Sequence, residues 1–365
     1  MKTKHFRYKG GKLPLPVFFP DATRAVIRSL DSVDIKLTKT PGILVNTFHL
    51  WKGLDKKILK KEKGIGKFMS WNGAIISDSG GFQVGSLIKK NPELGFVDDK
   101  GAHFKDEGKH LLLTPEESIK FQIELGSDMV VVLDDFTDPR ATHKKAEESV
   151  RRTIEWAKRS KDEFEKICTK KKLIGDKKPL ILAVIQGGFF QDLRKYCCEE
   201  LVKIGFDGFG YGGWPVNNDN TFDYESAKTI VENSPEDYLL YGLGVGKPED
   251  VVGLAKMGFD IFDCVLPTRD ARHRRLYVYD ANSIEKIDIN KKKFYSYVTP
   301  DKNIYFSDNS RVSNACDCLT CTNYSKAYLA HLFRIGDFTA GRLATIHNLR
   351  FYSILMDKIK VLTSI

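Results

Sequence analysis

The chain alternates short apolar runs with longer amphipathic stretches. Eight of the apolar runs are rich in β-branched and aromatic residues, which favours buried parallel strands. They are Pro16–Phe19, Ile43–Val45, Ala74–Ile76, Met129–Leu133, Leu180–Ile185, Asp207–Tyr211, Leu239–Leu243 and Asp260–Val265. Regular alternation of eight strands with helices predicts an α/β fold, specifically a (β/α)8 TIM barrel.

Helix starts and irregular segments define the expected domain organisation. Thr114-Pro115-Glu116-Glu117 and Lys247-Pro248-Glu249-Asp250 each place a proline and two acids in a first helical turn. Residues 88–112 predict a hairpin inserted after the third strand, and residues 270–322 are irregular before helical patterns return at Tyr324–Arg334 and Ala340–Lys360. We expect a barrel with the active site over residues 1–269, and a metal-binding subdomain with closing helices over residues 270–365.

Charge and cysteine spacing narrow the class of protein. Lys and Arg number 58 against 48 Asp and Glu, a net charge of +10 that suits a phosphate-rich partner such as nucleic acid, although many basic proteins bind none. No apolar run is long enough for a signal peptide or a membrane span, so a cytoplasmic protein without membrane attachment is expected. Three of the seven cysteines fall within six residues, at Cys316, Cys318 and Cys321, which indicates a metal site in a reducing compartment rather than disulfides.

Polar residues end four of the apolar runs. They are Asp78, Asp134, Gln186 and Asp263, each beside a glycine or a turn. A barrel brings the carboxyl ends of its strands to one mouth, so the four side chains should share a pocket, although any single aspartate there could simply cap the next helix. Paired carboxylates suit glycosyl chemistry, in which one attacks an anomeric carbon and the other protonates the leaving group.

Several longer motifs resemble the tRNA-guanine transglycosylase family, also known as the queuine tRNA-ribosyltransferases. The likeness runs through most of the chain, in one order, and its most specific part precedes the cysteine cluster. The motifs are Pro16–Pro20, Asn46–Leu50, Ser77–Val84, Gln186–Gly188, Gly242–Pro248 and Phe262–Arg269. The resemblance implies a zinc-bearing (β/α)8 barrel, usually a homodimer, that exchanges a guanine in tRNA for a deazaguanine.

The resemblance also implies roles for individual residues. Asp263 matches the nucleophile that displaces guanine from the ribose, and Asp78 matches the general acid/base. The guanine edge would be read by Asp134, Gln186 and the backbone of Gly213 and Trp214. Phe82 and Leu243 match the two faces that stack on the base, although both, and Leu243 in particular, could instead be core residues.

The remaining implied sites are a metal centre and an RNA-binding surface. Cys316, Cys318, Cys321 and His347 match the family's structural zinc site, and His331 is a rival ligand that we read as helix surface. In the family the stretch after the nucleophile approaches the anticodon loop. Here it carries Arg269, Arg272, Arg274 and Arg275, of which the first three are our candidate RNA contacts; any one of them could instead be a solvated surface charge.

Two departures from the family pattern lie where the 7-substituent of the base should sit. Trp214-Pro215-Val216-Asn217-Asn218 replaces a small-residue loop that usually ends in glutamate, and Phe136 occupies a position that is commonly cysteine or small. Proline has no N–H, so the peptide bond between Trp214 and Pro215 can offer the base only the Trp214 carbonyl. This predicts a preference for a 7-substituted deazaguanine, either queuine or its 7-aminomethyl-7-deazaguanine precursor, over guanine.

Three other functions fit parts of the pattern. A relative that inserts deazaguanine into DNA is the main rival, because the zinc site and the arginine-rich loop fit tRNA but neither excludes DNA. A non-catalytic RNA-binding subunit is disfavoured because Asp78 and Asp263 are both present. An ordinary glycoside hydrolase would use two carboxylates on a barrel equally well, but would not need the cysteine cluster or the residues that read guanine.

Overall fold

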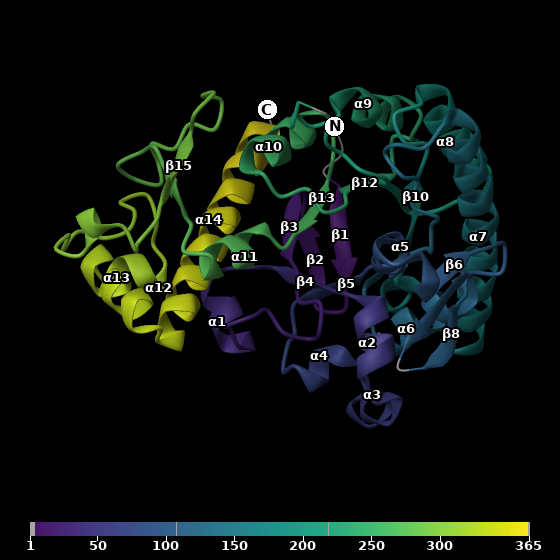
Figure 1. Cartoon of the computed structure of the whole chain (residues 1–365), viewed down its shortest axis with the longest axis horizontal. Helices are drawn as coiled ribbons and strands as arrows, with labels where there is room; N and C mark the ends of the chain where they lie inside the picture. Colours follow the sequence, from purple (N-terminus) through teal and green to yellow (C-terminus); the bar gives the residue numbers. More distant parts are fainter. Residues whose placement is uncertain (1–3, 107, 218, 364–365) are drawn as a thin grey trace.

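The computed structural model describes residues 4–106, 108–217 and 219–363 (Figure 1). Eight parallel strands form one sheet in the order β3-β13-β12-β11-β10-β9-β5-β4, and a parallel bridge between Asp21 and Leu44 joins its two edges. The strands are β3 (Val17–Pro20), β4 (Gly42–Val45), β5 (Ala74–Ser77), β9 (Met129–Val131), β10 (Leu180–Ile185), β11 (Gly208–Tyr211), β12 (Leu239–Gly242) and β13 (Ile261–Cys264). Each coincides with one of the eight predicted apolar runs, and the TIM-barrel prediction is confirmed.

Helices surround the barrel and connect its strands. They are α1 (Ser32–Leu37), α2 (Thr47–Gly53), α3 (Lys56–Glu62), α4 (Ile65–Phe68), α5 (Gly81–Lys90), α6 (Pro115–Leu125), α7 (His143–Lys170), α8 (Gln191–Ile204), α9 (Tyr224–Glu232) and α10 (Pro248–Lys256). Thr114 caps α6 as predicted, because its side chain accepts a hydrogen bond from the Glu117 amide. Pro248 opens α10, where Lys247 supplies no side-chain cap.

The interior of the barrel is filled with apolar side chains, and its amino-terminal end is closed. The hairpin of β1 (His5–Tyr8) and β2 (Gly11–Pro14) lies across that end. From it the fully buried Phe6 packs edge-to-face on Phe19 of β3, with ring centroids 5.4 Å apart. The opposite, carboxyl-terminal end is the one where barrels of this kind carry their chemistry.

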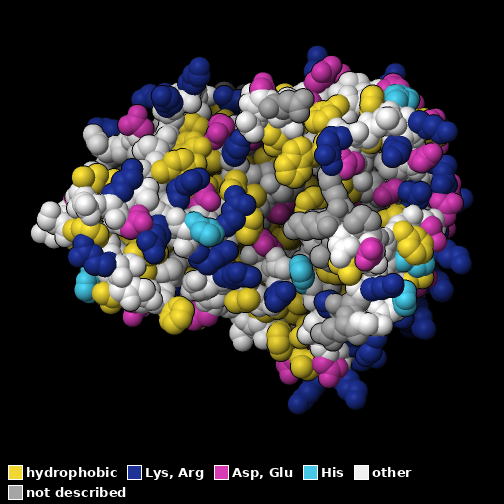
Figure 2. Space-filling model, in the orientation of Figure 1, with side chains coloured by type: hydrophobic (Ala, Val, Ile, Leu, Met, Phe, Trp, Pro, Cys, Tyr) yellow, Lys and Arg dark blue, Asp and Glu magenta, His cyan; other side chains and the backbone are white. Residues whose placement is uncertain are grey.

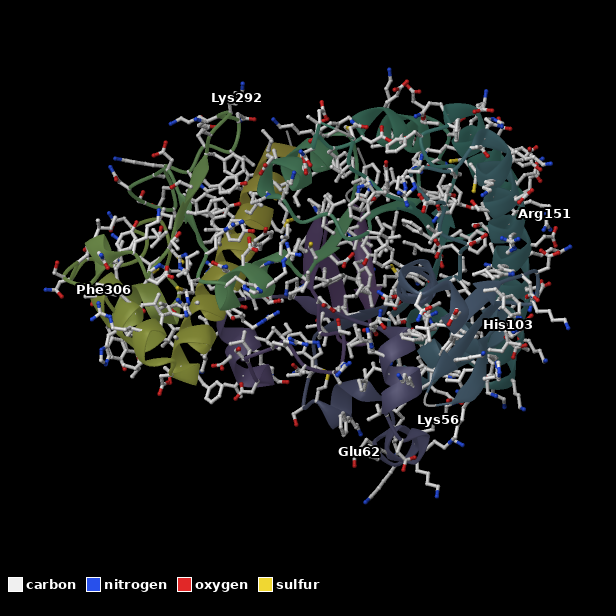
Figure 3. The ribbon with its side chains drawn as sticks, in the orientation of Figure 1. Lys56, Glu62, His103, Arg151, Lys292 and Phe306 are labelled. Atoms are coloured by element: carbon white, nitrogen blue, oxygen red, sulfur yellow. The ribbon has the colours of Figure 1, made fainter. Side chains whose placement is uncertain are left out.

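The insertion after the third barrel strand has three strands, where a two-stranded hairpin was predicted. They are β6 (Gly95–Val97), β7 (Ala102–Asp106) and β8 (Lys109–Leu113), preceded by a 3-10 turn, Pro92–Leu94. The predicted turn after β6 is present, since Asp98 accepts from the Lys100 amide. Arg151 of α7 pairs with Asp99 at 2.6 Å and anchors the insertion on the side of the molecule where Figure 3 labels Arg151 and His103.

The C-terminal region packs against the barrel through one long helix. Its elements are α11 (Leu266–Arg272), β14 (Leu276–Tyr279), β15 (Tyr295–Val298), a 3-10 turn (Asn303–Tyr305), α12 (Leu319–Asn323), α13 (Lys326–Ile335) and α14 (Phe338–Thr363). From α14, the buried Tyr352 ring lies 4.5 Å from Phe18 of β3, and Arg342 forms an ion pair with Asp34 of α1. Farther out, the Arg334 guanidinium lies 3.5 Å from the ring centroid of Phe306, which Figure 3 labels at the end of the molecule away from the barrel.

The predicted domain boundary at residue 269 falls inside α11 and stays a prediction. The hydrophobic core is continuous across it, because the apolar side chains of α14 pack with those on the outer face of the barrel strands. Within the described residues, no helix is long and apolar enough to cross a membrane.

Candidate active site and metal centre

Side-chain alternation along the strands determines which residues face the open end of the barrel. Interior apolar residues occupy alternate positions of most of the strands, among them Phe19 in β3, Ile76 in β5, Val184 in β10 and Ile261 in β13. The next interior positions toward the mouth are Asp21, Asp78, Gln186 and Asp263. Figure 2 shows acidic side chains in a recess near the middle of this face, with Lys and Arg side chains gathered on its side toward α11.

One oxygen of the Asp263 carboxylate accepts hydrogen bonds from the protein, and the other accepts none from the described residues. Its Oδ1 accepts hydrogen bonds from the Tyr241 hydroxyl at 2.7 Å and from the Gly244 amide at 2.8 Å. Oδ2 has no hydrogen-bond partner among the described residues. Burial raises the pKa of Asp263 to about 6, against the opposing effect of its two donors. The carboxylate is thus fixed by its neighbours with one oxygen free to react.

Asp78 is held at the same mouth by the segment that opens α2. Asn46 Nδ2 donates to Asp78 Oδ2 at 2.5 Å, and the Thr47 amide donates to Oδ1 at 2.9 Å. Asn46 also caps α2, since its Oδ1 accepts from the His49 amide at 2.9 Å, and this contact orients its NH₂ toward Asp78. Burial, together with the smaller effect of the nearby Asp21 and Asp263 charges, raises the pKa of Asp78 to about 7 against the opposing hydrogen bonds from Thr47 and Asn46. Near neutral pH, this carboxyl group can hold or release a proton.

Asp134 and Gln186 form a hydrogen-bonded pair at the ends of adjacent strands. Gln186 Nε2 donates to Asp134 Oδ2 at 2.7 Å, while its Oε1 accepts from the Thr137 amide at 3.1 Å. Ser79 donates to the other oxygen of Asp134 at 3.3 Å. Burial raises the pKa of Asp134 to about 6. The pair presents a ready-made set of acceptors and donors to a flat, polar ligand.

The buried guanidinium of Arg194 supports the loops around this pair. It donates to three backbone carbonyls, those of Ile185 at 3.1 Å, Gly188 at 2.8 Å and Gly212 at 3.0 Å. Its side chain is fully buried and lies over the ring of Tyr211, 4.6 Å from the centroid. Arg194 therefore ties the loop after β10 to the loop after β11.

The residues expected to contact a base lie around the same mouth. Phe82 on α5 is 48% exposed, and its ring meets Phe136 edge-on at a centroid distance of 5.2 Å. Leu243, partly buried, packs on the top of the interior core, so it is both a core residue and a wall of the mouth. Gly213 has a φ of +88°, which favours glycine, and neither its amide nor the Trp214 carbonyl has a partner among the described residues.

The four arginines after Asp263 differ in their surroundings. Arg269 is half exposed on α11, and Arg272 donates to the Thr268 carbonyl at 2.8 Å. Arg274 forms an ion pair with Asp301 at 3.0 Å, and Arg275 lies over the ring of Tyr297. Of the predicted RNA contacts, Arg269 and Arg272 therefore flank the mouth on the helix that follows Asp263, whereas Arg274 is already engaged by the C-terminal region.

The predicted zinc ligands form one buried cluster. The ligand atoms of Cys316, Cys318, Cys321 and His347 all lie within 4.8 Å of one another. His347 Nδ1 is 3.2 Å from the Cys321 sulfur and 3.6 Å from the Cys318 sulfur. Tetrahedral zinc with ordinary Zn–S and Zn–N bonds separates such atoms by about 3.6 Å. His347 Nε2 donates to the Tyr277 carbonyl at 2.7 Å, which leaves Nδ1 with its lone pair toward the thiols.

The other candidate ligand, His331, lies exposed on α13, as predicted. The cluster of three cysteines and one histidine therefore fits a metal ion with four protein ligands and no open position, which is typical of a structural site. It would join the loop before α12, α12 itself and α14.

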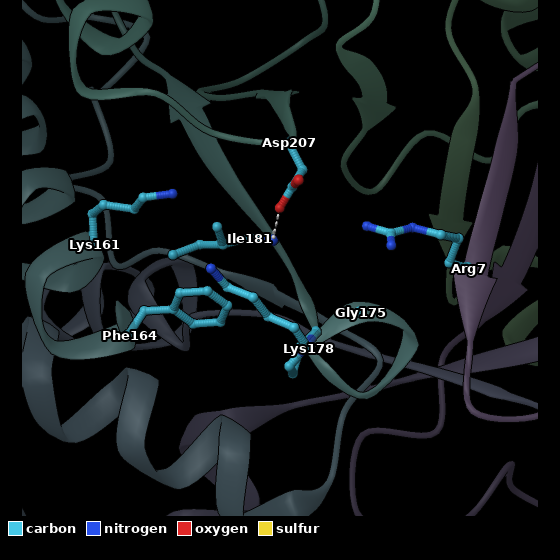
Figure 4. A pocket seen from close by; sticks show the side chains of 8 residues that line it. Arg7, Lys161, Phe164, Gly175, Lys178, Ile181 and Asp207 are labelled. Carbon is cyan, nitrogen blue, oxygen red and sulfur yellow. Dashed lines mark hydrogen bonds between the residues drawn. The ribbon is translucent and has the colours of Figure 1, made fainter. Parts of the chain in front are cut away.

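A cavity of about 200 Å³ lies at the amino-terminal end of the barrel, away from the polar strand ends (Figure 4). Arg7, Lys161 and Lys178 reach into it together with Asp207, whose carboxylate accepts from the Ile181 amide at 2.8 Å. Glu165 pairs with both lysines, at 3.2 Å and 2.7 Å. Both lysines thus already have an acidic partner, and we assign the chemistry to the opposite end.

Sequence reasoning missed three residues of the mouth, namely Asp21, Asn46 and Tyr241. Asp21 and Asn46 each stand two positions beyond an interior residue of their strand, Phe19 and Leu44 respectively. Extending the alternation past the end of each apolar run would have identified both. Tyr241 carries no such signal, because it lies inside an apolar run and only its hydroxyl reaches Asp263.

Comparison with known proteins gives matches over almost the whole chain. The family model described as queuine tRNA-ribosyltransferase matches residues 2–362. The queuine tRNA-ribosyltransferase of Haemophilus influenzae (strain PittEE) is 39% identical over 347 residues, which cover 94% of this chain and 84% of that protein. The proteins of the same name from Vibrio parahaemolyticus and Pasteurella multocida are 37% and 38% identical, over 97% and 94% of this chain and 87% and 83% of their own lengths.

Proposed function

Because the chain belongs to the queuine tRNA-ribosyltransferase family and is therefore a pentosyltransferase, we propose that it exchanges the wobble guanine of tRNA anticodons for a 7-substituted deazaguanine. The incoming base is queuine or its 7-aminomethyl-7-deazaguanine precursor. The reaction is a double displacement through a covalent aspartyl-ribose intermediate. The observation that carries this proposal is the Asp263 carboxylate, with one oxygen held by two donors and the other free, at the same mouth as a protonatable Asp78.

In the first displacement, Asp263 Oδ2 attacks C1′ of the guanosine ribose. The new C1′–O ester bond forms as the C1′–N9 bond breaks, and the electron pair of the broken bond passes to guanine. Asp78 supplies the proton that neutralises the departing base, which its pKa of about 7 permits near neutral pH. Asp263 is the stronger acid of the two, with a pKa of about 6, so it is the carboxylate that loses its proton first.

The second displacement reverses these roles with a new base. After guanine leaves, the deazaguanine enters the same site, and Asp78 removes the proton from its N9. The nitrogen attacks C1′, the ester bond to Asp263 breaks, and the nucleophile is regenerated. Two inversions at C1′ give overall retention.

Base recognition is assigned to the Asp134–Gln186 pair, the backbone of Gly213 and Trp214, and two apolar walls. An ionised Asp134 accepts from the N1 hydrogen and the 2-amino group of a guanine-type base together, which adenine does not offer. Phe82 and Leu243 lie against the two faces, and stacking contributes on the order of 1–3 kcal/mol per base. The unpartnered backbone groups at Gly213 and Trp214 support this assignment.

A structural zinc ion, one per chain, is assigned to Cys316, Cys318, Cys321 and His347. Zinc would supply folding stability there rather than catalysis, because four protein ligands leave no position for substrate. The net charge of +10 supports a nucleic-acid substrate, with Arg269, Arg272 and Arg274 as RNA contacts. A homodimer in the cytoplasm is the proposed working form.

Exchange of radiolabelled guanine tests this function against its alternatives. The protein is incubated separately with tRNA, with duplex DNA and with neither, and acid-insoluble label is counted. The proposal requires label in tRNA. Label in DNA alone would favour a DNA deazaguanine transglycosylase, and no label in either would favour a non-catalytic RNA-binding subunit.

A further inference from the structure

We propose that Asp21 recognises the sugar of the reacting nucleotide by accepting a hydrogen bond from its 2′-hydroxyl group, so that the enzyme prefers RNA to DNA at the exchanged position. This inference rests on the proposed function, because it takes Asp263 as the nucleophile. It assigns substrate selectivity to a carboxylate that has no part in the exchange chemistry itself.

The strand register places Asp21 close to the reacting carbon. Strand β3 pairs in parallel with β13, and Phe19 lies opposite Asp263. Asp21 follows two residues later on the same interior face, so its Cα lies about 8 Å from that of Asp263 by ordinary strand spacing. Since C2′ is bonded to C1′, a hydroxyl on C2′ comes within reach of the Asp21 carboxylate when Asp263 attacks C1′.

On the side away from β13, Asp21 neighbours the segment that holds Asp78, the general acid. Asp21 forms the bridge to Leu44 of β4 that closes the barrel, and Asn46, two residues farther along, donates to Asp78. Asp21 therefore stands between the strand of the nucleophile and the strand end that holds Asp78. In agreement with this position, its charge raises the pKa of both carboxylates.

Only one oxygen of Asp21 is used by the protein. Oδ1 accepts from the Thr23 amide at 2.8 Å and from the Thr23 hydroxyl, in a local turn. Oδ2 has no hydrogen-bond partner among the described residues, and Asp21 forms no ion pair with any of them. The turn thus uses Oδ1 alone, and Oδ2 of this partly buried residue is left available to a donor group of a ligand.

Burial raises the pKa of Asp21 above its ordinary value. The Thr23 hydrogen bonds and the positive charges of His49 and Arg272 oppose this shift, and neither His49 nor Arg272 forms an ion pair with Asp21. His49 itself has a lowered pKa, because of its burial and the neighbouring Arg24. An ionised carboxylate repels phosphate and accepts from a hydroxyl group, so a sugar hydroxyl is the part of a nucleotide that fits it.

Two anticodon stem-loops that differ in one atom test the proposal. One carries guanosine and the other 2′-deoxyguanosine at the exchanged position, and kcat/KM for each stem-loop is measured by the incorporation of labelled guanine. A hydrogen bond to a charged group corresponds to a ribo-to-deoxy ratio of roughly 10–100 in the wild type. In Asp21→Ala the ratio should fall by about that factor, while Asp21→Asn, whose amide oxygen still accepts, should retain part of it. Comparing ratios cancels the different intrinsic reactivity of the two sugars.

A matched control separates recognition from general destabilisation. Asp34→Ala removes a buried carboxylate of α1, which pairs with Arg342 on the outside of the barrel. It should lower stability and leave the ratio unchanged. The inference is overturned if the Asp21→Ala ratio equals that of the wild type, or if Asp34→Ala changes it equally. Absence of exchange on the ribose substrate by the wild type would instead overturn the proposed function.

Discussion

The hydroxyl group of Tyr241 donates a hydrogen bond of 2.7 Å to Asp263 from the neighbouring strand of the barrel. Tyr241 is fully buried, and burial together with the adjacent carboxylate raises its pKa well above the ordinary value, so the hydroxyl remains a donor. Because this bond engages Oδ1, it directs the lone pairs of the other oxygen toward the mouth.

Removing that hydroxyl tests its importance for the nucleophile. Tyr241→Phe keeps the ring and loses the donor, so kcat for exchange should fall by roughly 10–100-fold, the range for a hydrogen bond to a charged group. The pKa of Asp263 should also rise, because Tyr241 lowers it. The measurement is exchange of labelled guanine as a function of pH. A variant with wild-type kcat and an unshifted acid limb would show that Gly244 alone holds the carboxylate.

The two raised pKa values predict a bell-shaped pH dependence for the first displacement. Asp263 must be ionised, so kcat/KM should rise with pH until about 6; Asp78 must be protonated, so it should fall above about 7. In Asp78→Asn exchange should be about 10²–10⁴-fold slower and should lose the alkaline limb. Activity that increases steadily to pH 9 in the wild type would contradict this assignment of acid and nucleophile.

Metal removal should affect the C-terminal region before the barrel. Elemental analysis of protein purified without chelator should give one zinc per chain. A chelator should then expose amides of α12 and α14 to hydrogen exchange, since structural zinc contributes folding free energy directly. Cys321→Ser should lose the metal, whereas Cys168→Ser, a buried cysteine of α7, should retain it. Full metal content in Cys321→Ser would refute the ligand set.

The choice of incoming base should depend on Pro215. This residue has no N–H, and its carbonyl accepts from the Asp223 amide at 2.8 Å, which helps to hold the loop in place. Bound guanine therefore lacks a hydrogen bond to its N7, which weakens its binding by about 0.5–1.5 kcal/mol. Queuine and 7-aminomethyl-7-deazaguanine should both outcompete it. The measurement is competition of each base against labelled guanine. Pro215→Ala should narrow the difference in binding between guanine and the two deazaguanines. An unchanged ranking of the bases would show that the proline does not determine the choice of base.

The sequence predicted the barrel and part of its mouth for one physical reason. Strands that are buried on both faces are continuously apolar, so each stands out, and the polar residue after it marks the mouth. This identified Asp78, Asp134, Gln186 and Asp263. The same pattern cannot show which strands are neighbours, so the position of Asp21 between Asp263 and the Asn46 segment required the closed sheet.

Other features depended on contacts between distant segments. Arg194 looks like an ordinary charged residue of an amphipathic helix, yet it is buried among three carbonyls of two loops. The insertion was predicted with one strand too few, because Lys109–Leu113 gains its strand character from pairing with β7. Short, half-exposed strands carry a weak pattern of their own.

The covalent intermediate is tested most directly by mass spectrometry of the denatured enzyme after incubation with an anticodon stem-loop RNA. Wild-type protein should gain the mass of the RNA less one guanine, and peptide mapping should place the adduct on Asp263. In Asp263→Ala no adduct should form, whereas Asp78→Asn should form it slowly. An adduct on another residue, or exchange of labelled guanine by Asp263→Ala, would contradict the account.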